Sequence, residues 1–342
     1  MANLTDFCVQ LPKIEVHAHI NGSLSPQTMR ALVARKVDMN PELAAFEIPD
    51  SLDRIDDFFS LFKFIYQLTD DEVSVAFATQ QIMEEFAADG VRYLELRTTP
   101  RANSAKGMTK ASYIDTVLTT IATKCPAGML TKLIISIDRR NTLEEAQYTV
   151  DLALKARECG FPIVGVDLCG DVMKGSFEAL RPAFERARQQ GQFPLTLHFN
   201  EVKENMHEAP ELLSIYPERL GHATLLDDPS RAIIYERAVP VEICMTSNVF
   251  SKTVPSYEDH HVKELLEEGH PFILCTDDKG VFGSDLSNEY VLAANTFGLN
   301  REQLFEASFK SIDAIFANNE TKDQLRAIWG AWKNQHQDLF TE

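Results

Sequence analysis

The chain lacks the features that mark membrane-spanning, exported and nucleic-acid-binding proteins. No apolar run approaches the roughly 20 residues needed to cross a bilayer, and the start, MANLTDFCVQLPK, has no basic segment followed by an apolar one. Basic residues are scarce, with 33 Lys and Arg against 51 Asp and Glu and a formal net charge of -18. Nucleic acids and anionic membranes are bound through Lys and Arg, so we expect neither partner. A cytoplasmic protein is the expectation.

Cysteine is also scarce, and its spacing excludes two kinds of site. The six cysteines include no CxxC pair of the kind found in zinc ribbons and redox proteins, so we expect buried, reduced thiols. GxGxxG is absent, and GDVMKGS has no lysine after its second glycine, where a phosphate-binding loop has one. No nicotinamide or nucleotide-fold cofactor is implied. A small phosphorylated ligand remains open, because a few local basic groups suffice to bind it.

What the sequence does contain is a series of short, β-rich apolar runs with helical segments between them. Apolar residues at three- and four-residue spacing predict helices over 142–159 and 176–190. Gly160, Gly191 and Gly269 follow helical segments and are expected to cap them. Eight such units predict a (β/α)8 TIM-type barrel in one domain, 1–342, with a doubly wound sheet as the alternative. The predicted strands cover 13–20, 91–99, 131–139, 161–170, 193–201, 218–224, 239–248 and 271–278.

A long helical insertion is predicted between the first two strands, and amphipathic helices from Leu299 onward are expected to close the barrel. The insertion contains SLDRIDDFFSLFKFIYQL, residues 51–68. Its apolar residues cover nearly all sides of a helix, which predicts packing on two sides, either as a core helix or as an aromatic lid over the active site. These residues are Phe58, Phe59, Leu61, Phe62, Phe64, Ile65 and Tyr66.

Polar residues fall at the ends of the predicted strands, where (β/α)8 barrels carry their catalytic groups. His17 and His19 end the first strand and, two residues apart, project to the same side. His198 ends the fifth strand and Asp277 the eighth. Three imidazoles and one carboxylate suit Zn²⁺ with one position left for water. No lysine ends the fourth strand to bridge two metals, so we expect one zinc ion per chain.

Further polar residues lie at the same end of the predicted barrel: Gly170, Glu201, His222, Ser247, Asn248 and Asp278. Taken singly, each has an ordinary explanation, such as a core histidine or a helix N-cap in TDD. The joint pattern favours a metal site. Glu15 shares the face of His17 and His19 and is an alternative ligand, but we expect it to support the layer below the metal. We expect five other histidines to be solvated: His207, His260, His261, His270 and His336.

Six segments, in order, carry a resemblance to a known family: PKIEVHAHINGS, VGVDLCGD, LHFNE, RLGHAT, MTSN and LCTDDKGVF. Together they resemble the adenosine/AMP deaminase family of metal-dependent aminohydrolases, and more narrowly its adenosine deaminase-like branch, the N6-methyl-AMP deaminases. The resemblance spans nearly the whole chain. The ordered set is specific, whereas any one segment alone would be weak.

The resemblance implies a role for each matching residue. His17, His19, His198 and Asp277 match the zinc ligands. The metal would lower the pKa of a water to about 7, so that hydroxide can attack C6 of the purine. Glu201 matches the acid/base group that protonates N1.

Three further roles follow from the same resemblance. His222 matches the group that orients the attacking water and helps deprotonate it. Asp278 matches the carboxyl that bonds N7 and helps hold the water, and the Gly170 N–H is implied for N3. Two places depart from the common pattern. Phe199 and Asn200 stand where small residues often precede the glutamate, which leaves the shape of the HFNE turn open, and Ala223 stands where glycine is usual.

One residue bears on the choice of substrate. Nucleoside deaminases of this family carry an acid two residues after the second metal histidine, placed to bond the ribose 5′-hydroxyl, and here that position is Asn21. A carboxylate facing a phosphate would meet like charge, whereas an amide can donate a hydrogen bond, so Asn21 favours a 5′-monophosphate. The expected substrate contacts are His19, Asn21, Thr98, Thr99, Arg101, Gly170, Asp278 and Lys279.

The leading hypothesis is zinc-dependent hydrolysis of N6-methyl-AMP to IMP and methylamine by a monomer that acts on a small-molecule purine nucleotide. An adenosine or AMP deaminase that releases ammonia is the alternative, since one methyl group is worth only about 1–3 kcal/mol of discrimination. A two-metal amidohydrolase, such as a lactonase or phosphotriesterase, is more remote. An inactive ligand-binding barrel is disfavoured, because no residue with an expected role is missing.

Overall fold

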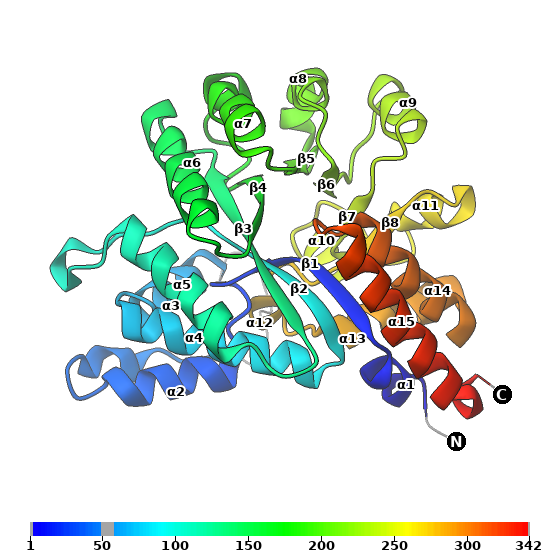
Figure 1. The fold of residues 1–342 in the computed structure, drawn as a ribbon, viewed down its shortest axis with the longest axis horizontal. Helices are drawn as coiled ribbons and strands as arrows, with labels where there is room; N and C mark the ends of the chain where they lie inside the picture. The colour runs from blue at the N-terminus through cyan, green and yellow to red at the C-terminus, as the bar shows by residue number, and fades with distance from the viewer. Residues whose placement is uncertain (1–2, 49–57, 341–342) are drawn as a thin grey trace.

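The computed structural model describes residues 3–48 and 58–340, and its centre is a sheet of eight parallel strands (Figure 1). The strands neighbour one another in chain order. The barrel closes where Ala18 bridges Asp277, because the His19 N–H donates to the Asp277 carbonyl at 3.0 Å. This confirms the predicted (β/α)8 barrel over the doubly wound alternative. The strands are β1 (Lys13–His19), β2 (Val91–Thr98), β3 (Leu130–Asp138), β4 (Ile163–Cys169), β5 (Leu195–Phe199), β6 (Arg219–His222), β7 (Val241–Ile243) and β8 (Phe272–Leu274).

Helices surround the strands as an outer layer, which Figure 1 shows most clearly from α5 to α9. Thr142 begins the helix that follows β3 with a capping box, in which its hydroxyl accepts from the Glu145 N–H and the Glu145 carboxylate accepts from the Thr142 N–H. Ser176 caps the next helix. The layer comprises α4 (Glu72–Ala88), α5 (Lys110–Lys124), α6 (Leu143–Glu158), α7 (Phe177–Gly191), α8 (Ala209–Ser214), α9 (Asp228–Glu236), α11 (Val262–Glu268) and α14 (Arg301–Lys310).

The predicted capping glycines fit in two cases out of three. Gly160 follows α6 at φ 81° and Gly269 caps α11 at φ 66°, both in the left-handed region that glycine tolerates. Gly191 is still helical, and Gln192 takes the left-handed position at φ 48°. The prediction for Gly191 is therefore wrong by one residue.

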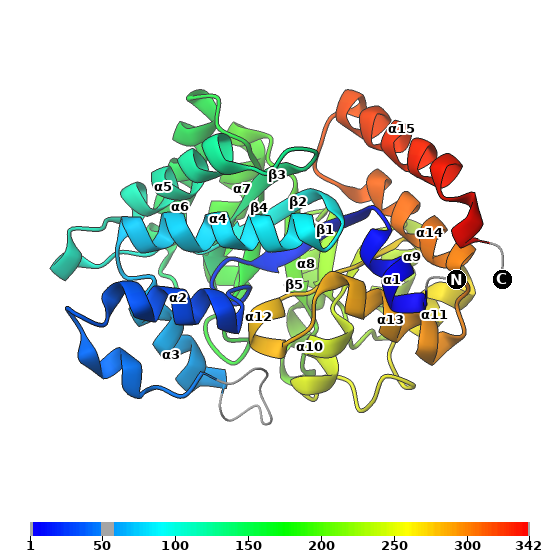
Figure 2. The same cartoon turned by 90° about the horizontal axis from the view of Figure 1, so that it is seen from below.

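The insertion after β1 contains α2 (Pro26–Lys36), a 3₁₀ turn η1 (Pro41–Ala45) and α3 (Phe58–Leu68), and Figures 1 and 2 both show α2 and α3 side by side. One stripe of α3 is buried: Leu61, Phe64, Ile65 and Leu68. Lys63 and Tyr66 are exposed, so the predicted packing on two sides is wrong for the residues that can be judged. Residues 51–57 and the side chains of Phe58 and Phe59 lie outside the described part of the chain.

Short helices and turns complete the fold. The run 239–248, predicted as one strand, is strand only over β7, and its second half is helical. As predicted, helices form the C-terminal part, where the Trp329 indole N–H donates to the Ser308 hydroxyl at 3.0 Å. The remaining elements are α1 (Leu4–Gln10), η3 (Ser104–Lys106), η4 (Lys203–Glu208), α10 (Met245–Phe250), α12 (Lys279–Phe282), α13 (Leu286–Phe297), η5 (Ser311–Ala314), α15 (Asn319–Gln335) and η6 (Gln337–Leu339).

Two further expectations can be compared with the structure. Within residues 3–48 and 58–340, no helix combines the length and the apolar character that a membrane crossing requires. All six cysteines are free thiols. Four of them are buried as predicted, whereas Cys125 is half-buried and Cys159 is exposed.

Charged side chains occupy the interior of the barrel. Arg97 of β2 donates to Glu242 at 2.9 Å and to Asp167 at 3.2 Å. Arg219 donates to the other oxygen of Glu242 at 2.7 Å and to Glu95 at 2.6 Å. All of these side chains are fully buried. Removing one partner would leave an uncompensated charge in the core, at a cost of about 3–5 kcal/mol.

Glu289 of α13 makes the folding stability dependent on pH. It is buried and accepts hydrogen bonds from Thr246 and Ser284, but burial outweighs these bonds and raises its pKa from 4.5 to about 7. The folded state therefore binds a proton that the unfolded state has released, and this group's contribution falls as pH rises from about 4.5 through about 7. The loss amounts to roughly 3 kcal/mol.

Glu289→Gln is expected to remove that loss. Urea unfolding at pH 5 and pH 8 should show the variant gaining stability relative to the wild type at the higher pH. Glu302→Gln, at an exposed carboxylate of α14, serves as the control and should show no such difference. If the free energy of unfolding of E289Q differed from that of the wild type by the same amount at both pH values, Glu289 would not be the source of the pH dependence.

Candidate metal and substrate site

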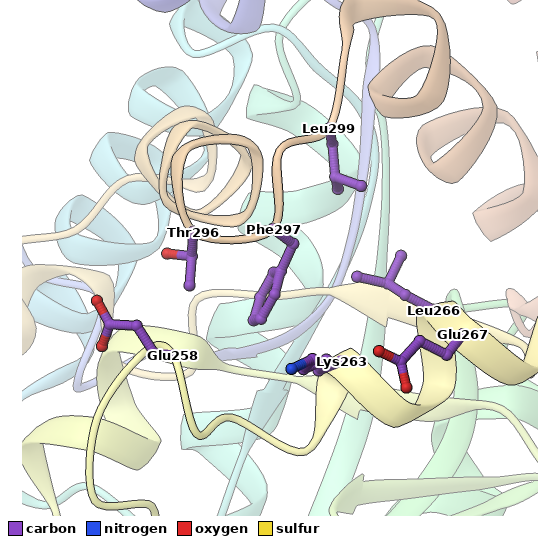
Figure 3. Close-up of a pocket in the computed structure, with 7 residues that line it drawn as sticks. All are labelled: Glu258, Lys263, Leu266, Glu267, Thr296, Phe297 and Leu299. Atoms are coloured by element: carbon purple, nitrogen blue, oxygen red, sulfur yellow. The ribbon is translucent and has the colours of Figure 1, made fainter.

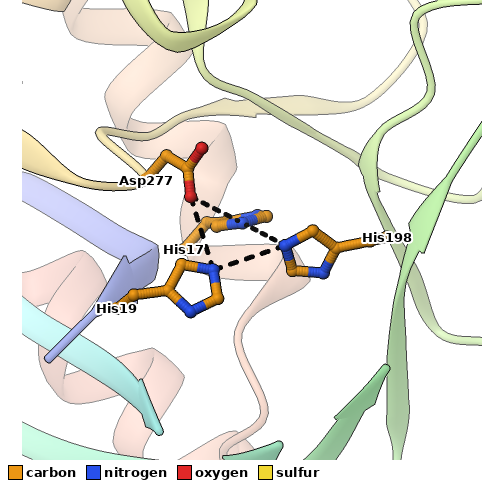
Figure 4. A group of neighbouring side chains, drawn as sticks. All are labelled: His17, His19, His198 and Asp277. Atoms are coloured by element: carbon orange, nitrogen blue, oxygen red, sulfur yellow. Dashed lines mark hydrogen bonds and ion pairs between the residues drawn. The ribbon is translucent and has the colours of Figure 1, made fainter. Parts of the chain in front are cut away.

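Four side chains converge at the carboxyl end of the barrel (Figure 4): His17 and His19 from β1, His198 from β5, and Asp277 just after β8. The Nε2 atom of His198 lies 3.2 Å from Nε2 of His17 and 3.3 Å from Nε2 of His19. Oδ1 of Asp277 lies 3.5 Å from the Nε2 of His17 and 3.3 Å from that of His19. The structure thus brings together all four residues that the sequence proposes as metal ligands.

These distances fit one metal ion of the size of zinc. Ligand atoms held about 2.0–2.1 Å from an ion in a tetrahedron stand about 3.3 Å from each other. The Nδ1 atoms point away, because Nδ1–H of His17 donates to Glu242 at 2.7 Å and Nδ1–H of His198 donates to Asp167 at 3.1 Å. Their Nε2 atoms therefore face each other, an arrangement that a proton or a metal ion between them stabilises.

Further hydrogen bonds hold the ligands in place. The Ser247 hydroxyl donates to Oδ2 of Asp277 at 2.6 Å, which leaves Oδ1 directed at the histidines. Glu15, fully buried, accepts from the N–H of His17 at 2.7 Å and from the N–H of Thr276 at 2.9 Å. Glu15 therefore joins β1 to β8 below the ligands, as predicted, and is not in the ligand group.

The two histidines of β1 differ in their affinity for protons. Burial lowers the pKa of both. For His17, hydrogen bonds with Asp277 and Glu242 outweigh burial and raise the pKa to about 9, whereas for His19 burial dominates and lowers it to about 3. A metal bound here would thus compete with a proton chiefly at His17.

Glu201 and His222 lie beside the ligands. Nε2 of His222 is 3.8 Å from Glu201 and 3.9 Å from Asp277, gaps that a substrate or water atom can bridge. Burial raises the pKa of Glu201 and lowers that of His222 well below its usual range. A carboxyl whose affinity for a proton is increased therefore stands next to an imidazole whose affinity is decreased, which is a suitable pair for acid/base chemistry.

Asp278 is held in a tight space formed by the turn after β1. A Cβ atom on Gly22 would lie 1.6 Å from Oδ1 of Asp278, so only glycine fits there. This Oδ1 is buried and has no hydrogen-bond partner among the described residues. Burial first, and then the charge of Asp277, raise the pKa of Asp278 well above its usual range. The result is a protonatable carboxyl with one buried oxygen that lacks a hydrogen-bond partner, a feature that calls for a functional explanation.

Left-handed backbone conformations accumulate around the site. The non-glycine residues with positive φ there are Asn200 at 47°, His222 at 61°, Ala223 at 48° and Asp277 at 62°. Asn200 tolerates this region, so the HFNE turn forms despite its unusual sequence. Ala223, which replaces the usual glycine, pays a steric cost of roughly 1–2 kcal/mol. Strained residues of this kind are typical of functional sites.

A polar group lies around Asn21, where the sequence expects the substrate's 5′ end. Arg101 donates to the Thr69 hydroxyl at 2.9 Å, and that hydroxyl donates to Oδ1 of Asn21 at 3.1 Å. The guanidinium also lies 4.0 Å above the ring of Tyr66. Thr69 had not been expected from the sequence, because only the packing of α3 brings it beside β1.

The other expected substrate contacts differ in accessibility. Thr98 is buried and shares a hydrogen bond of 2.7 Å with the Tyr113 hydroxyl, whereas Thr99 is half-buried beside Cys169 at 3.4 Å. Gly170 takes φ 103°, and a Cβ there would lie 2.7 Å from the Asp138 carboxylate.

Lys279 is placed differently from what we had expected. It is buried, and its ammonium donates to Glu85 at 2.8 Å and to Asp285 at 3.1 Å. Because both carboxylates already neutralise this ammonium, we leave Lys279 out of the proposed phosphate contacts.

The prediction of five solvated histidines is wrong for His260 and His270, which are buried, and His261 is half-buried. His270 donates to a backbone carbonyl of Val239 at 2.7 Å and is structural. His260 and His261 lie behind His222. The sequence pattern does not reveal this, because Asn248 lies 12 residues from His260 and His222 lies 39 residues from His261, on other elements of the fold.

A groove on the outer surface is not part of this site (Figure 3). It lies between α11 and α13 and is lined by Glu258, Lys263, Leu266, Glu267, Thr296, Phe297 and Leu299. None of these residues is a candidate ligand or substrate contact.

Comparisons with known proteins agree with this geometry. The family model described as adenosine deaminase matches residues 12–328. N6-Methyl-AMP deaminase of Danio rerio is 41% identical over 339 residues, covering 96% of this chain and 97% of the relative. The apo structure of the N6-methyl-AMP deaminase from Arabidopsis thaliana superposes with a TM-score of 0.89 at 36% identity, covering 97% and 100% of the two chains.

A second solved structure, Arabidopsis ADAL complexed with IMP, has a TM-score of 0.85 at 35% identity and covers 97% of this chain and 99% of its own. The match to the family model and the full-length similarity to curated relatives lead to the same assignment. The chain belongs to the adenosine deaminase family and is an aminohydrolase.

Proposed function

We propose that this protein hydrolyses N6-methyl-AMP to IMP and methylamine in a zinc-dependent reaction. The observation that carries the substrate choice is Asn21, an amide hydrogen-bonded into a group with Thr69 and Arg101 where a nucleoside deaminase has an acid. The names of the relatives support the same substrate, and a related structure holds IMP, the proposed product.

Zinc is the metal we propose, because three imidazole nitrogens and one carboxylate oxygen at tetrahedral spacing suit it. When bound by His17, His19, His198 and Asp277, it would lower the pKa of a water so that hydroxide is available near neutral pH. The carboxylates on His17 and His198 would keep both rings oriented toward it.

The remaining residues would act on the purine. Glu201, whose pKa is raised, would deliver a proton to N1, which makes C6 more electrophilic. N7 carries no hydrogen, so Asp278 must be protonated to bond it, as its raised pKa favours. The Gly170 N–H would serve N3, and His222 would orient the attacking water. Methylamine would leave from C6.

The 5′-phosphate would be recognised at the other end of the pocket. Arg101 offers a guanidinium, and Asn21 and Thr69 offer neutral donors. Thr99, half-buried at the end of β2, would add a hydroxyl. Thr98 would support this edge through Tyr113. Cytoplasmic location and a monomeric state stay predictions.

A substrate panel with the Asn21→Asp variant tests the phosphate argument. The zinc-loaded wild type should prefer N6-methyl-AMP over N6-methyladenosine, AMP and adenosine. N21D should lower kcat/KM for the monophosphates by about 100-fold, equivalent to roughly 3 kcal/mol, because like charge would face the phosphate. Activity on the free nucleosides should be maintained or improved.

Asn318→Asp is the matched control, since it adds the same charge at the exposed N-cap of α15, where Asp caps equally well. A wild-type preference for free nucleosides would refute the role of Asn21. A preference for AMP would select the AMP deaminase alternative.

Glu201→Gln is expected to bind zinc normally but to lose turnover by at least about 100-fold, because an amide cannot deliver the proton to N1. Steady-state rates and metal content measured on the same sample separate the two effects. Glu204→Gln, in the neighbouring η4, should be active. Undiminished activity of E201Q would show that Glu201 is not the acid.

His17→Ala should reduce zinc content from one ion per chain to a small fraction after dialysis against a chelator, measured by elemental analysis. The exposed His207, which bonds the Glu204 carbonyl, provides the control His207→Ala. Full occupancy in H17A would contradict the ligand set. Two metals per wild-type chain would favour the two-metal amidohydrolase alternative.

A further inference from the structure

A second layer of polar residues stands behind His222, made by Asn248 of α10 and His260 and His261 just before α11. The Asn248 amide contacts Nδ1 of His222 at 3.0 Å, and Nε2 of His260 contacts Oδ1 of Asn248 at 3.2 Å. Asn248, His222 and His260 are all buried. The three side chains therefore form a chain of hydrogen bonds closed off from solvent.

The donor and acceptor roles along this chain of hydrogen bonds are set by a backbone N–H, which can only donate. The Val262 N–H, at the start of α11, donates to Nδ1 of His260 at 3.2 Å. It belongs to the first turn of a helix, where N–H groups have no partner within the helix. Since Nδ1 of His260 accepts, its proton is on Nε2, which donates to Oδ1 of Asn248. Burial lowers the pKa of His260 to about 2, which keeps the ring neutral.

The remaining orientation follows. With Oδ1 of Asn248 facing His260, its NH₂ group faces His222 and donates to Nδ1. Nδ1 of His222 is therefore an acceptor, and the single ring proton lies on Nε2. This Nε2–H is directed toward Glu201 and Asp277, the side of the ring where the reaction would take place.

His261 holds the same residue through its backbone. Its Nε2 donates to the carbonyl of His222 at 2.7 Å, and its ring stacks on His260 with 4.4 Å between centroids. His222 is one of the strained residues, at φ 61°. The ring and the backbone of His222 are thus both held by the pair of histidines before α11.

We propose that Asn248 and His260 are positioning residues that fix His222 as the Nε2–H form, so that it presents a hydrogen-bond donor to the attacking water and not a base. The proposal rests on the proposed function for its kinetic part. It assigns proton removal from the water to Glu201, which can accept once it has given its own proton to N1 and can then pass the new proton to the departing methylamine. His222 is left to orient the water and stabilise the negative charge that develops on its oxygen.

The tautomer of His222 can be measured directly in the zinc-loaded wild type. Long-range ¹H–¹⁵N correlation of histidine-labelled protein, with His222 assigned by loss of its signals in His222→Gln, should show a protonated Nε2 and an unprotonated Nδ1. A protonated Nδ1 would overturn the proposal. This result does not depend on the identity of the substrate.

Asn248→Asp reverses the hydrogen bond while retaining its shape. The carboxylate can only accept, so it should draw the proton of His222 to Nδ1, and kcat should fall by about 100-fold or more, as wrong-tautomer variants of catalytic histidines do. KM should change by less than about threefold, and zinc content should be unchanged. A structural role alone would predict retained activity, because both hydrogen bonds persist.

Asn318→Asp again controls for the added charge and should match the wild type. Retained kcat in N248D, or loss of its zinc, would contradict the positioning role, which is confined to His222. Absence of any deaminase turnover in the wild type would instead refute the proposed function, and the NMR measurement would still decide the tautomer.

Discussion

Two carboxylates beneath the proposed metal ligands share one buried guanidinium, and the candidate site depends on this arrangement. Arg97 joins Asp167 to Glu242, and these acids in turn hold His198 and His17. Each carboxylate is buried and would be costly without its cation. Burial makes it costly in folding free energy to break the ion pairs of Arg97. Because these pairs fix the carboxylates, and the carboxylates fix the imidazoles, the candidate ligand atoms already stand at metal-binding distances.

The same principle operates at His222, at the end of the neighbouring strand β6, with neutral groups in place of charged ones. His222 is held through Asn248 and His260, a chain that begins at a helix N–H. A carboxylate suits a proposed metal ligand such as His17 or His198, because it accepts a hydrogen bond from Nδ1–H and so leaves the lone pair of Nε2 for the metal. Neutral supports suit a ring whose proton must face the reaction. In the proposed mechanism, the hydrogen-bond partners of His17, His198 and His222 thus decide which ring nitrogen of each carries the hydrogen.

Backbone strain accompanies this positioning. His222 and Asp277 both have left-handed φ values, and both carry side chains that must leave the strand direction to face the centre. Space in the site is also tight where Gly22 packs against the Asp278 carboxyl, since a side chain at position 22 would overlap it. Asn21 stands next to that glycine, so the turn that accommodates the Asp278 carboxyl also presents the amide to which we assign phosphate recognition.

By itself the sequence determined the barrel and its four candidate metal ligands. The alternation of short apolar runs with segments of helical periodicity is a local property of the sequence. Polar residues at the ends of the strands then converge because the strands of the barrel are parallel. What only the tertiary structure decided depends on contacts across long separations. The bond from Arg97 to Glu242 spans 145 residues, and Lys279 meets Glu85 across 194. Thr69 reaches Asn21, and His260 approaches Asn248, only after helices pack. Such pairings produce no periodic pattern in the sequence, because they form only when helices and strands that are far apart in the chain pack against each other.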